Sequence, residues 1–190
     1  MKATEPIRNK KQIKEFLNYL CKSGQYRNYV LATLCLHTAL RISDILRLSC
    51  NDVYDFKNQS LKKSITIIEK KTGKTKTIPL HKNILKALKY YYQEAKPNTP
   101  LVLNKRTGKA ISRIQAYRLL CTAAEFLGFK QRVSCHSLRK TFGYHAWKDG
   151  TSPAVIMEIY NHSSLAITRR YLGVTQDDMN IVYINLNLSG

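Results

Sequence analysis

The first third of the chain places apolar residues at helical spacing. From Asn9 to Lys22 they recur every three or four positions, and Gly24 stands where such a helix would end. The same reasoning predicts a second helix over Tyr29–Thr38 and a third that begins near Ile42. The N-terminal part is therefore expected to be helical.

The period of the pattern changes in the middle of the chain. Ser64–Glu69 and Thr75–Leu80 are rich in β-branched residues, and Lys71-Thr72-Gly73-Lys74 lies between them. Two such runs around a short segment with glycine predict a β-hairpin with a basic tip.

Helical spacing returns after the hairpin. It predicts helices over Asn83–Glu94, Ser112–Leu127 and roughly Ser137–Lys148. Ser112 is a good N-cap, and Gly128 follows the end of the same helix.

Two more helices are expected before the tail. Thr151-Ser152-Pro153 combines a cap with proline at the first helical position, and a short last helix leads to Tyr171. After Gly173 the tail is strand-like over residues 181–186. The predicted fold class is α+β, mainly α, with a small antiparallel sheet.

Length and composition indicate one domain. The 190 residues contain no internal repeat or Pro/Gly/Ser-rich linker, and an apolar share of 44% allows a proper core. We expect a single domain over residues 1–190, with an N-terminal helical segment over about 1–24 and a tail over 174–190.

Net charge indicates the class of partner. Thirty-two Lys and Arg against twelve Asp and Glu leave +20, beyond the magnitude of about 2–8 that serves solubility. Such an excess favours a polyanion, and nucleic acid fits better than a membrane because no basic amphipathic terminal helix is present. The alternative is a basic protein with a solvated face. No apolar run nears the roughly 20 residues of a membrane span, and no apolar stretch follows the basic N-terminus as in a secretory signal. We therefore expect a cytoplasmic, nucleoid-associated protein that is encoded by a bacterium or a phage.

The cysteines are isolated and odd in number, with no CxxC pair. This argues against a disulfide framework and a zinc module, and no metal or cofactor is expected. The five are Cys21, Cys35, Cys50, Cys121 and Cys135.

Three segments carry candidate chemistry: residues 39–46 with Arg41, residues 136–142 with the pattern His-x-x-Arg, and residues 161–164, followed by Tyr171 nine residues after His162. Together with the hairpin lysine, this order resembles the catalytic domain of the tyrosine recombinases, the phage integrase family, from about Tyr26 to Leu172. Each motif alone is weak, but five in this order and spacing are specific.

The resemblance implies strand exchange through a covalent DNA intermediate. Arg41 and Arg139 would hold the phosphate oxygens, since guanidinium is always charged and bidentate. His136 and His162 would donate hydrogen bonds to the phosphate or move the proton of Tyr171. Tyr171 would attack phosphorus and form a 3′-phosphotyrosine without metal or ATP.

The resemblance also implies a lysine on the hairpin as general acid for the leaving 5′ oxygen. Counting back from Pro79 places it at Lys71, with Lys70 and Lys74 as the alternatives.

An acidic residue near the first arginine is a further feature of the family. Here it is Asp44, which we expect to hold Arg41 or a histidine. One departure concerns Asn161, since many members have glycine before the histidine that corresponds to His162.

Each candidate also has a purely structural explanation. Arg41 alone would be a surface or cap residue, and His136, just before a predicted helix, a capping or core histidine. The remaining histidines have no counterpart in the family's site: His145 is expected to be structural, and His37 and His81 to lie at helix ends.

The front of the chain departs from the family, whose members usually carry an N-terminal helical domain on the other side of the duplex. Only about 25 residues precede the catalytic pattern, so the chain is expected to be a short member or a fragment. Weaker DNA binding and accessory proteins would follow.

The tail bears an apolar strip after the nucleophile, at Ile181, Val182, Ile184, Leu186 and Leu188. In the family this segment packs in trans and links protomers in a tetramer on DNA. The alternative is a strand that closes its own domain in cis, in a monomer without DNA.

Three functions are compatible with these features. The leading hypothesis is a site-specific DNA recombinase or integrase of a mobile element acting on double-stranded DNA. The alternatives are a non-catalytic DNA-binding regulator of the same fold and an enzyme like type IB topoisomerases that relaxes DNA without sequence preference.

Overall fold

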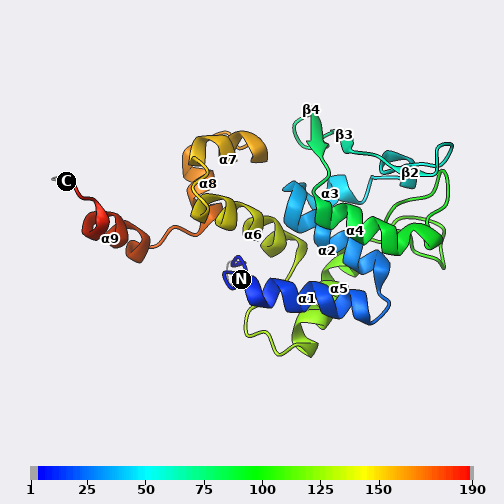
Figure 1. The fold of residues 1–190 in the computed structure, drawn as a ribbon, viewed down its shortest axis with the longest axis horizontal. Helices are drawn as coiled ribbons and strands as arrows, with labels where there is room; N and C mark the ends of the chain where they lie inside the picture. Colours follow the sequence, from blue (N-terminus) through cyan, green and yellow to red (C-terminus); the bar gives the residue numbers. More distant parts are fainter. Residues whose placement is uncertain (1–3, 189–190) are drawn as a thin grey trace.

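A computed structural model describes residues 4–188 of the chain (Figure 1). The elements, in order, are α1 (Lys10–Lys22), α2 (Tyr26–Thr38), α3 (Ile42–Ile45), η1 (Cys50–Asp52), β1 (Tyr54–Asp55), β2 (Ser60–Leu61), β3 (Ser64–Ile68), β4 (Thr75–Pro79), α4 (Lys82–Tyr91), η2 (Tyr92–Glu94), α5 (Arg113–Phe126), α6 (Cys135–Lys148), α7 (Pro153–Tyr160), α8 (Leu165–Leu172) and α9 (Gln176–Asn185). The predicted α+β class, mainly α with a small antiparallel part, is confirmed.

Helix α2 forms the centre of the main core and packs against α1, α4 and α6. Ten of its thirteen residues are buried, because apolar side chains occur on all of its faces. Two buried hydroxyls, of Thr33 and Thr38, donate to backbone carbonyls one turn earlier at 2.7 Å. The helix therefore carries no unpaired polar group into the core.

A second, smaller core joins α6, α7 and α8, which lie together on the left in Figure 1. Its buried members are Ala39, Ile156, Tyr160 and Leu172. Since Ala39 follows α2, this cluster connects the end of the central helix to the C-terminal helices.

The helix ends follow the local signals in the sequence. Ser112 and Gln115 form a reciprocal capping box at α5, and Ser152 caps α7 with Pro153 at its first position. These predictions are confirmed, while α2 begins three residues before its predicted start.

The predicted hairpin is present. β3 and β4 pair antiparallel from Ser64 opposite Pro79 to Ile68 opposite Thr75, and Gly73 in the connection has a φ of 68°. A second small sheet, β1 with β2, was not expected from the sequence.

The tail differs from its prediction. Residues 181–186 were expected to form a strand, but they lie in or directly after helix α9. Thr175 and Asp178 form a capping box, and Asp177 and Asp178 lie near the positive N-terminal end of the helix dipole. A helix also pairs its backbone groups internally, whereas no strand in the described residues lies beside the tail to pair with it.

The chain ahead of α1 is anchored on α6. Ile7 is fully buried, its N–H donates to Thr141 Oγ1 at 2.8 Å, and its carbonyl lies 3.0 Å from His145 Nε2. His145 thus has the structural contact expected of it. Among residues 4–188 no helix is long and apolar enough to cross a membrane.

Candidate active site

Four segments far apart in the sequence bring the candidate residues together. Arg41 caps α3 just after α2, and His136 and Arg139 lie in the first turns of α6. His162 follows the end of α7, and Tyr171 lies in the last turn of α8. His136 lies inside its helix rather than before it, because Ser134 is the N-cap.

Tyr171 is surrounded by the candidate histidines. Its ring centroid lies 4.5 Å from that of His162, 5.1 Å from that of His136 and 5.3 Å from that of Tyr160. The guanidinium carbon of Arg139 is 6.0 Å from the ring. A nucleophile, two proton-transfer groups and a cation are thus adjacent.

A cavity of about 230 Å³ lies beside Tyr171, His136 and Arg139. Its lining residues are Arg41, Ile42, Ser43, Arg113, Cys135, His136, Arg139 and Tyr171. The tyrosine thus shares one concave site with both arginines.

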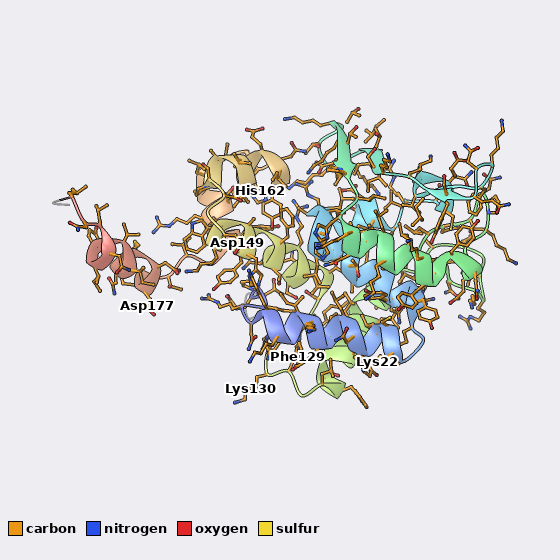
Figure 2. The ribbon with its side chains drawn as sticks, in the orientation of Figure 1. Lys22, Phe129, Lys130, Asp149, His162 and Asp177 are labelled. Atoms are coloured by element: carbon orange, nitrogen blue, oxygen red, sulfur yellow. The ribbon has the colours of Figure 1, made fainter. Side chains whose placement is uncertain are left out.

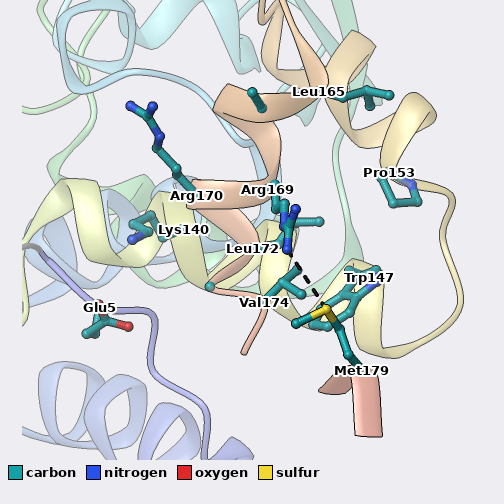
Figure 3. A pocket seen from close by; sticks show the side chains of 12 residues that line it. Glu5, Lys140, Trp147, Pro153, Leu165, Arg169, Arg170, Leu172, Val174 and Met179 are labelled. Carbon is teal, nitrogen blue, oxygen red and sulfur yellow. Dashed lines mark hydrogen bonds between the residues drawn. The ribbon is translucent and has the colours of Figure 1, made fainter. Parts of the chain in front are cut away.

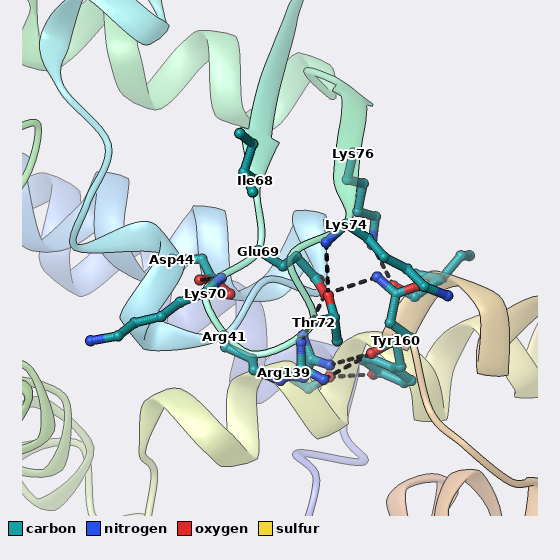
Figure 4. A network of polar contacts seen from close by, with 12 residues as sticks. Arg41, Asp44, Ile68, Glu69, Lys70, Thr72, Lys74, Lys76, Arg139 and Tyr160 are labelled. Carbon is teal, nitrogen blue, oxygen red and sulfur yellow. Dashed lines mark hydrogen bonds and ion pairs between the residues drawn. The ribbon is translucent and has the colours of Figure 1, made fainter.

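The two arginines are held side by side by one backbone carbonyl. Arg41 Nη2 and Arg139 Nη2 each donate to the Tyr160 oxygen at 3.2 Å (Figure 4). Arg139 is only 3% exposed, yet its Nε and Nη1 make no hydrogen bond within the described residues. Buried donors of this kind fit an anionic ligand, since buried polar groups are rarely left unpaired.

The electrostatics of the site favour an anion and neutral histidines. Burial, and then the charge of Arg41, lowers the pKa of Arg139. Burial, and then the charges of Arg139 and Arg41, lowers the pKa of His162 to about 4. His136 also has a lowered pKa, through burial and then Lys140 and Arg139. Near pH 7 both imidazoles are therefore neutral, and each has one nitrogen that can accept a proton.

His162 is oriented by a neighbour on α8. Its Nδ1 lies 3.0 Å from the hydroxyl oxygen of Thr168, which is fully buried. The ring also stacks on Tyr160, with centroids 4.9 Å apart. The imidazole is thereby fixed on two sides next to Tyr171 (Figure 2 shows its place under α7).

Residues 8–177 match the Phage integrase family. This chain belongs to the phage integrase family. It is 38% identical over 183 residues to the "Probable integrase/recombinase YoeC" of Bacillus subtilis (strain 168), covering 96% of this chain and 97% of that protein. It is 28% identical to the tyrosine recombinase XerC of Thermodesulfovibrio yellowstonii, but it spans only 53% of that relative's length.

Solved structures share the fold. The crystal structure of XerA recombinase superposes with a TM-score of 0.76 at 19% identity, over 96% of this chain and 65% of the other. The catalytic domain of bacteriophage HP1 integrase has a TM-score of 0.59 at 20% identity and is covered to 98%. The fold of this chain is therefore similar to that of recombinase and integrase catalytic domains of known structure.

The hairpin lysines of this family member differ in their surroundings. The charge of Lys71 is near enough to His162 to contribute, after burial and the charges of Arg139 and Arg41, to the lowered pKa of that histidine. The Lys70 side chain points away from the arginine pair in Figure 4. This placement supports Lys71, which stays a prediction.

The expected role of Asp44 has to be revised. Asp44 is 3% exposed, and its Oδ1 accepts a hydrogen bond from the backbone N–H of Lys70 at 2.9 Å. Arg41 is paired instead with Glu69, at 3.0 Å. Asp44 lies on α3, and its partner is the hairpin backbone at Lys70 rather than a guanidinium group.

Three further side chains at the site were not predicted. Glu69 is fully buried beside Arg41, Arg113 lines the cavity at the start of α5, and Lys76 on β4 donates to the Ile159 carbonyl. Burial lowers the pKa of Lys76. Strand alternation would have indicated Lys76, since it shares a face with the buried Ile78. No local signal marks Arg113.

The remaining histidines and four of the five cysteines do not line this cavity, whereas Cys135 does. His37 is in the last turn of α2 and His81 caps α4, and their rings stack 4.6 Å apart. All five thiols are free. Within residues 4–188, no three His, Cys, Asp or Glu side chains are grouped as a metal site.

Proposed function

We propose that this protein is a site-specific DNA recombinase that cleaves and rejoins double-stranded DNA through a 3′-phosphotyrosine on Tyr171. Membership of the phage integrase family supports this function. The observation that carries the residue assignment is that both histidine rings lie next to the Tyr171 ring and that both arginines share a cavity with Tyr171.

The proposed cleavage step balances without an external reactant. The Tyr171 oxygen forms a bond to phosphorus while the bond from phosphorus to the 5′ oxygen breaks, and Lys71 protonates that oxygen. His162, neutral at pH 7, takes the tyrosine proton, with His136 donating to the phosphate. The reverse reaction with a new 5′ hydroxyl rejoins the DNA, because the ester retains the energy of the broken bond.

The arginines stabilise the charge of the transition state. The unpaired Nε and Nη1 of Arg139 are placed to donate to non-bridging phosphate oxygens, beside Arg41. Buried donors that are already oriented stabilise the transition-state charge more than donors in water do, because they do not have to reorient during the reaction.

The proposal includes assembly of four protomers on DNA, with α9 packing on a neighbour. α9 buries none of its residues, and Ile181, Val182 and Ile184 are at least half exposed. The alternative is a tail that packs on its own domain in cis, where Asp178 of α9 already pairs with Lys148. A groove of about 1110 Å³ beside α8, lined by Trp147, Leu165 and other residues, offers an apolar acceptor surface (Figure 3).

The proposal also covers the domain organisation of the chain, its location in the cell and its further partners. One catalytic domain with a C-terminal assembly helix fits the match to residues 8–177, which ends within the first turn of α9. We place the protein with its DNA in the bacterial cytoplasm, with accessory DNA-binding proteins as further partners.

The test is trapping of the covalent intermediate. Wild-type protein and Tyr171→Phe are incubated, without metal or ATP, with a pool of nicked suicide duplexes that includes the DNA flanking the gene. Denaturing gels are expected to show a 3′ adduct with wild type and none with Tyr171→Phe. Tyr90→Phe, a change at a tyrosine that is 44% exposed on α4, serves as the matched control.

Other outcomes would redirect the assignment. An adduct that survives Tyr171→Phe would contradict the nucleophile. Salt-sensitive binding without any adduct would support a regulator. Relaxation of supercoiled DNA at many sequences by a monomer would support a topoisomerase.

A further inference from the structure

A buried carboxylate, that of Glu69, lies beside the site and has no part in the proposed reaction. Glu69 lies directly after strand β3, and its side chain has no exposed surface. An ionised carboxylate in such a place is costly unless several donors satisfy it.

One oxygen of Glu69 accepts hydrogen bonds from three side chains in three different segments (Figure 4). Its Oε2 accepts from Arg41 Nη1 at 3.0 Å, from Thr72 Oγ1 at 2.9 Å and from Asn161 Nδ2 at 2.8 Å. These donors come from the turn before α3, the hairpin tip and the turn after α7. The carboxylate therefore connects distant parts of the chain, and Asn161 lies 92 residues from Glu69 in the sequence.

Each of these segments carries a residue of the proposed site. Arg41 is itself one of the two arginines, Thr72 follows Lys71, and Asn161 precedes His162. A side chain that fixes Thr72 and Asn161 also restricts the backbone of the residue beside each. Glu69 thus constrains the arginine, the lysine and the histidine through one atom.

Asn161 combines an unusual backbone conformation with a side-chain hydrogen bond to Glu69. Its backbone is left-handed, with φ 50° and ψ 51°, at the C-cap of α7. Glycine adopts this conformation with the least strain, and asparagine tolerates it. Glycine, however, has no amide to donate to Glu69, so asparagine supplies both the turn and the hydrogen bond.

The charge balance agrees with this arrangement. Burial opposes ionisation of Glu69, but the hydrogen bonds from Asn161 and Thr72 and the charge of Arg41 outweigh it and lower its pKa. The carboxylate offsets the mutual repulsion of Arg41, Arg139 and Lys76 when no phosphate is bound.

We propose that Glu69, together with Asn161, is a positioning residue that aligns Arg41, the Lys71 hairpin and the His162 turn before DNA binds. This inference rests on the proposed function for its effect on cleavage. It acts through the geometry of other residues, and Glu69 itself does not contact the reacting atoms.

The test compares Glu69→Ala, Glu69→Gln, Asn161→Gly and the double variant Glu69→Ala/Asn161→Gly. In single-turnover cleavage of a saturating suicide substrate, Glu69→Ala is expected to be slower by about tenfold to a hundredfold, the loss typical of a charged hydrogen-bond network. The dissociation constant for DNA is expected to change less than about threefold, since the DNA-contacting cations remain. Glu69→Gln retains an acceptor and is expected to fall between Glu69→Ala and wild type.

A second readout does not depend on catalysis. In the DNA-free protein, amide hydrogen exchange over residues 69–75 and 161–163 is expected to be faster by about tenfold in Glu69→Ala and to a lesser degree in Asn161→Gly. The double variant is expected to resemble Glu69→Ala, because both changes remove the same bond. Glu158→Ala, which removes an exposed carboxylate on α7, is the matched control and is expected to change neither readout.

The two proposals fail in different ways. If wild type forms no adduct, the recombinase mechanism fails, while exchange still reports whether Glu69 holds the three segments. If wild type forms the adduct but Glu69→Ala and Asn161→Gly cleave and exchange like wild type, the positioning role is overturned. If Glu69→Ala does not fold, Glu69→Gln and Asn161→Gly decide by the same two readouts.

Discussion

Tyr160 is the residue on which the arrangement of the two arginines depends. It is fully buried, its carbonyl accepts from both guanidiniums, and its ring lies 4.5 Å from the guanidinium carbon of Arg139. Its hydroxyl donates to the Arg139 carbonyl at 2.5 Å and accepts from the Gly143 N–H at 2.8 Å. α6 and α7 are thus joined at one side chain, directly below the site.

Gly143 leaves the space that this contact needs. A β-carbon at this position would lie 2.5 Å from the Tyr160 hydroxyl. We expect Gly143→Ala to destabilise the protein by about 1–3 kcal/mol through overpacking, despite a gain of about 1 kcal/mol in helix propensity. Urea unfolding measures this change, and Gly143→Ala/Tyr160→Phe should recover part of the loss. An unchanged unfolding midpoint in Gly143→Ala would contradict the argument.

His37 makes stability depend on pH. Burial, and then His81, lowers its pKa from 6.5 to about 4 in the folded state. Between these values the unfolded chain binds more protons, so the free energy of unfolding falls as pH drops through this window. His162 has a similar shift. The pKa values of His136 and His145 are also lowered by burial. We expect His37→Gln to remove part of the pH-dependent loss, measured by urea unfolding from pH 7 to pH 4. An equally steep loss in the variant would argue against His37.

At the scale of elements, α9 stands apart from the rest. Figure 1 shows it projecting from α8 at the end of the chain, and Figure 2 places Asp177 on it, away from the main body. A ten-residue helix is marginal alone in water, and its contacts with the body include the ion pair of Lys148 with Asp178. An element of this kind contributes little to folding and is suited to a partner.

Removal of residues 175–190 should therefore separate folding from assembly. We expect the melting temperature to change by less than about 3 °C, because α9 buries no residue. We also expect complexes with more than one protomer on a cleaved DNA site to be lost, as measured by native gels. Ile184→Lys, a single change at a side chain that is 80% exposed, should weaken assembly in the same direction. A large drop in melting temperature would show that α9 belongs to its own domain's core.

For the whole molecule, the excess of 20 positive charges dominates the interaction with DNA. Lysines and arginines that neutralise phosphates release counterions, so affinity falls steeply with salt. The same charge raises the rate of encounter with DNA of any sequence. Recognition of one site must then come from contacts with bases or from sequence-dependent DNA shape.

The salt dependence is a direct test of DNA contact. If roughly six phosphates are neutralised, the dissociation constant should rise about a thousandfold between 50 and 200 mM salt. Fluorescence anisotropy with a random-sequence duplex measures this slope. A flat response would contradict an extensive DNA interface.

The sequence alone determined the features that depend on neighbours in the chain. The caps at Ser112 and Ser152, the β3–β4 hairpin and the order of Arg41, the His-x-x-Arg pair, His162 and Tyr171 could all be predicted from it. Capping, turn geometry and motif spacing act over a few residues, so they can be read along the chain.

Only the tertiary structure decided which charges meet and which strip remains exposed. Glu69 pairs with Arg41 and Asn161 across 28 and 92 residues, and Asp44 turns to the hairpin backbone instead. The apolar tail was predicted as a strand from its sequence, but residues 176–185 form helix α9. Such contacts depend on how distant segments pack, and local patterns carry no information about that.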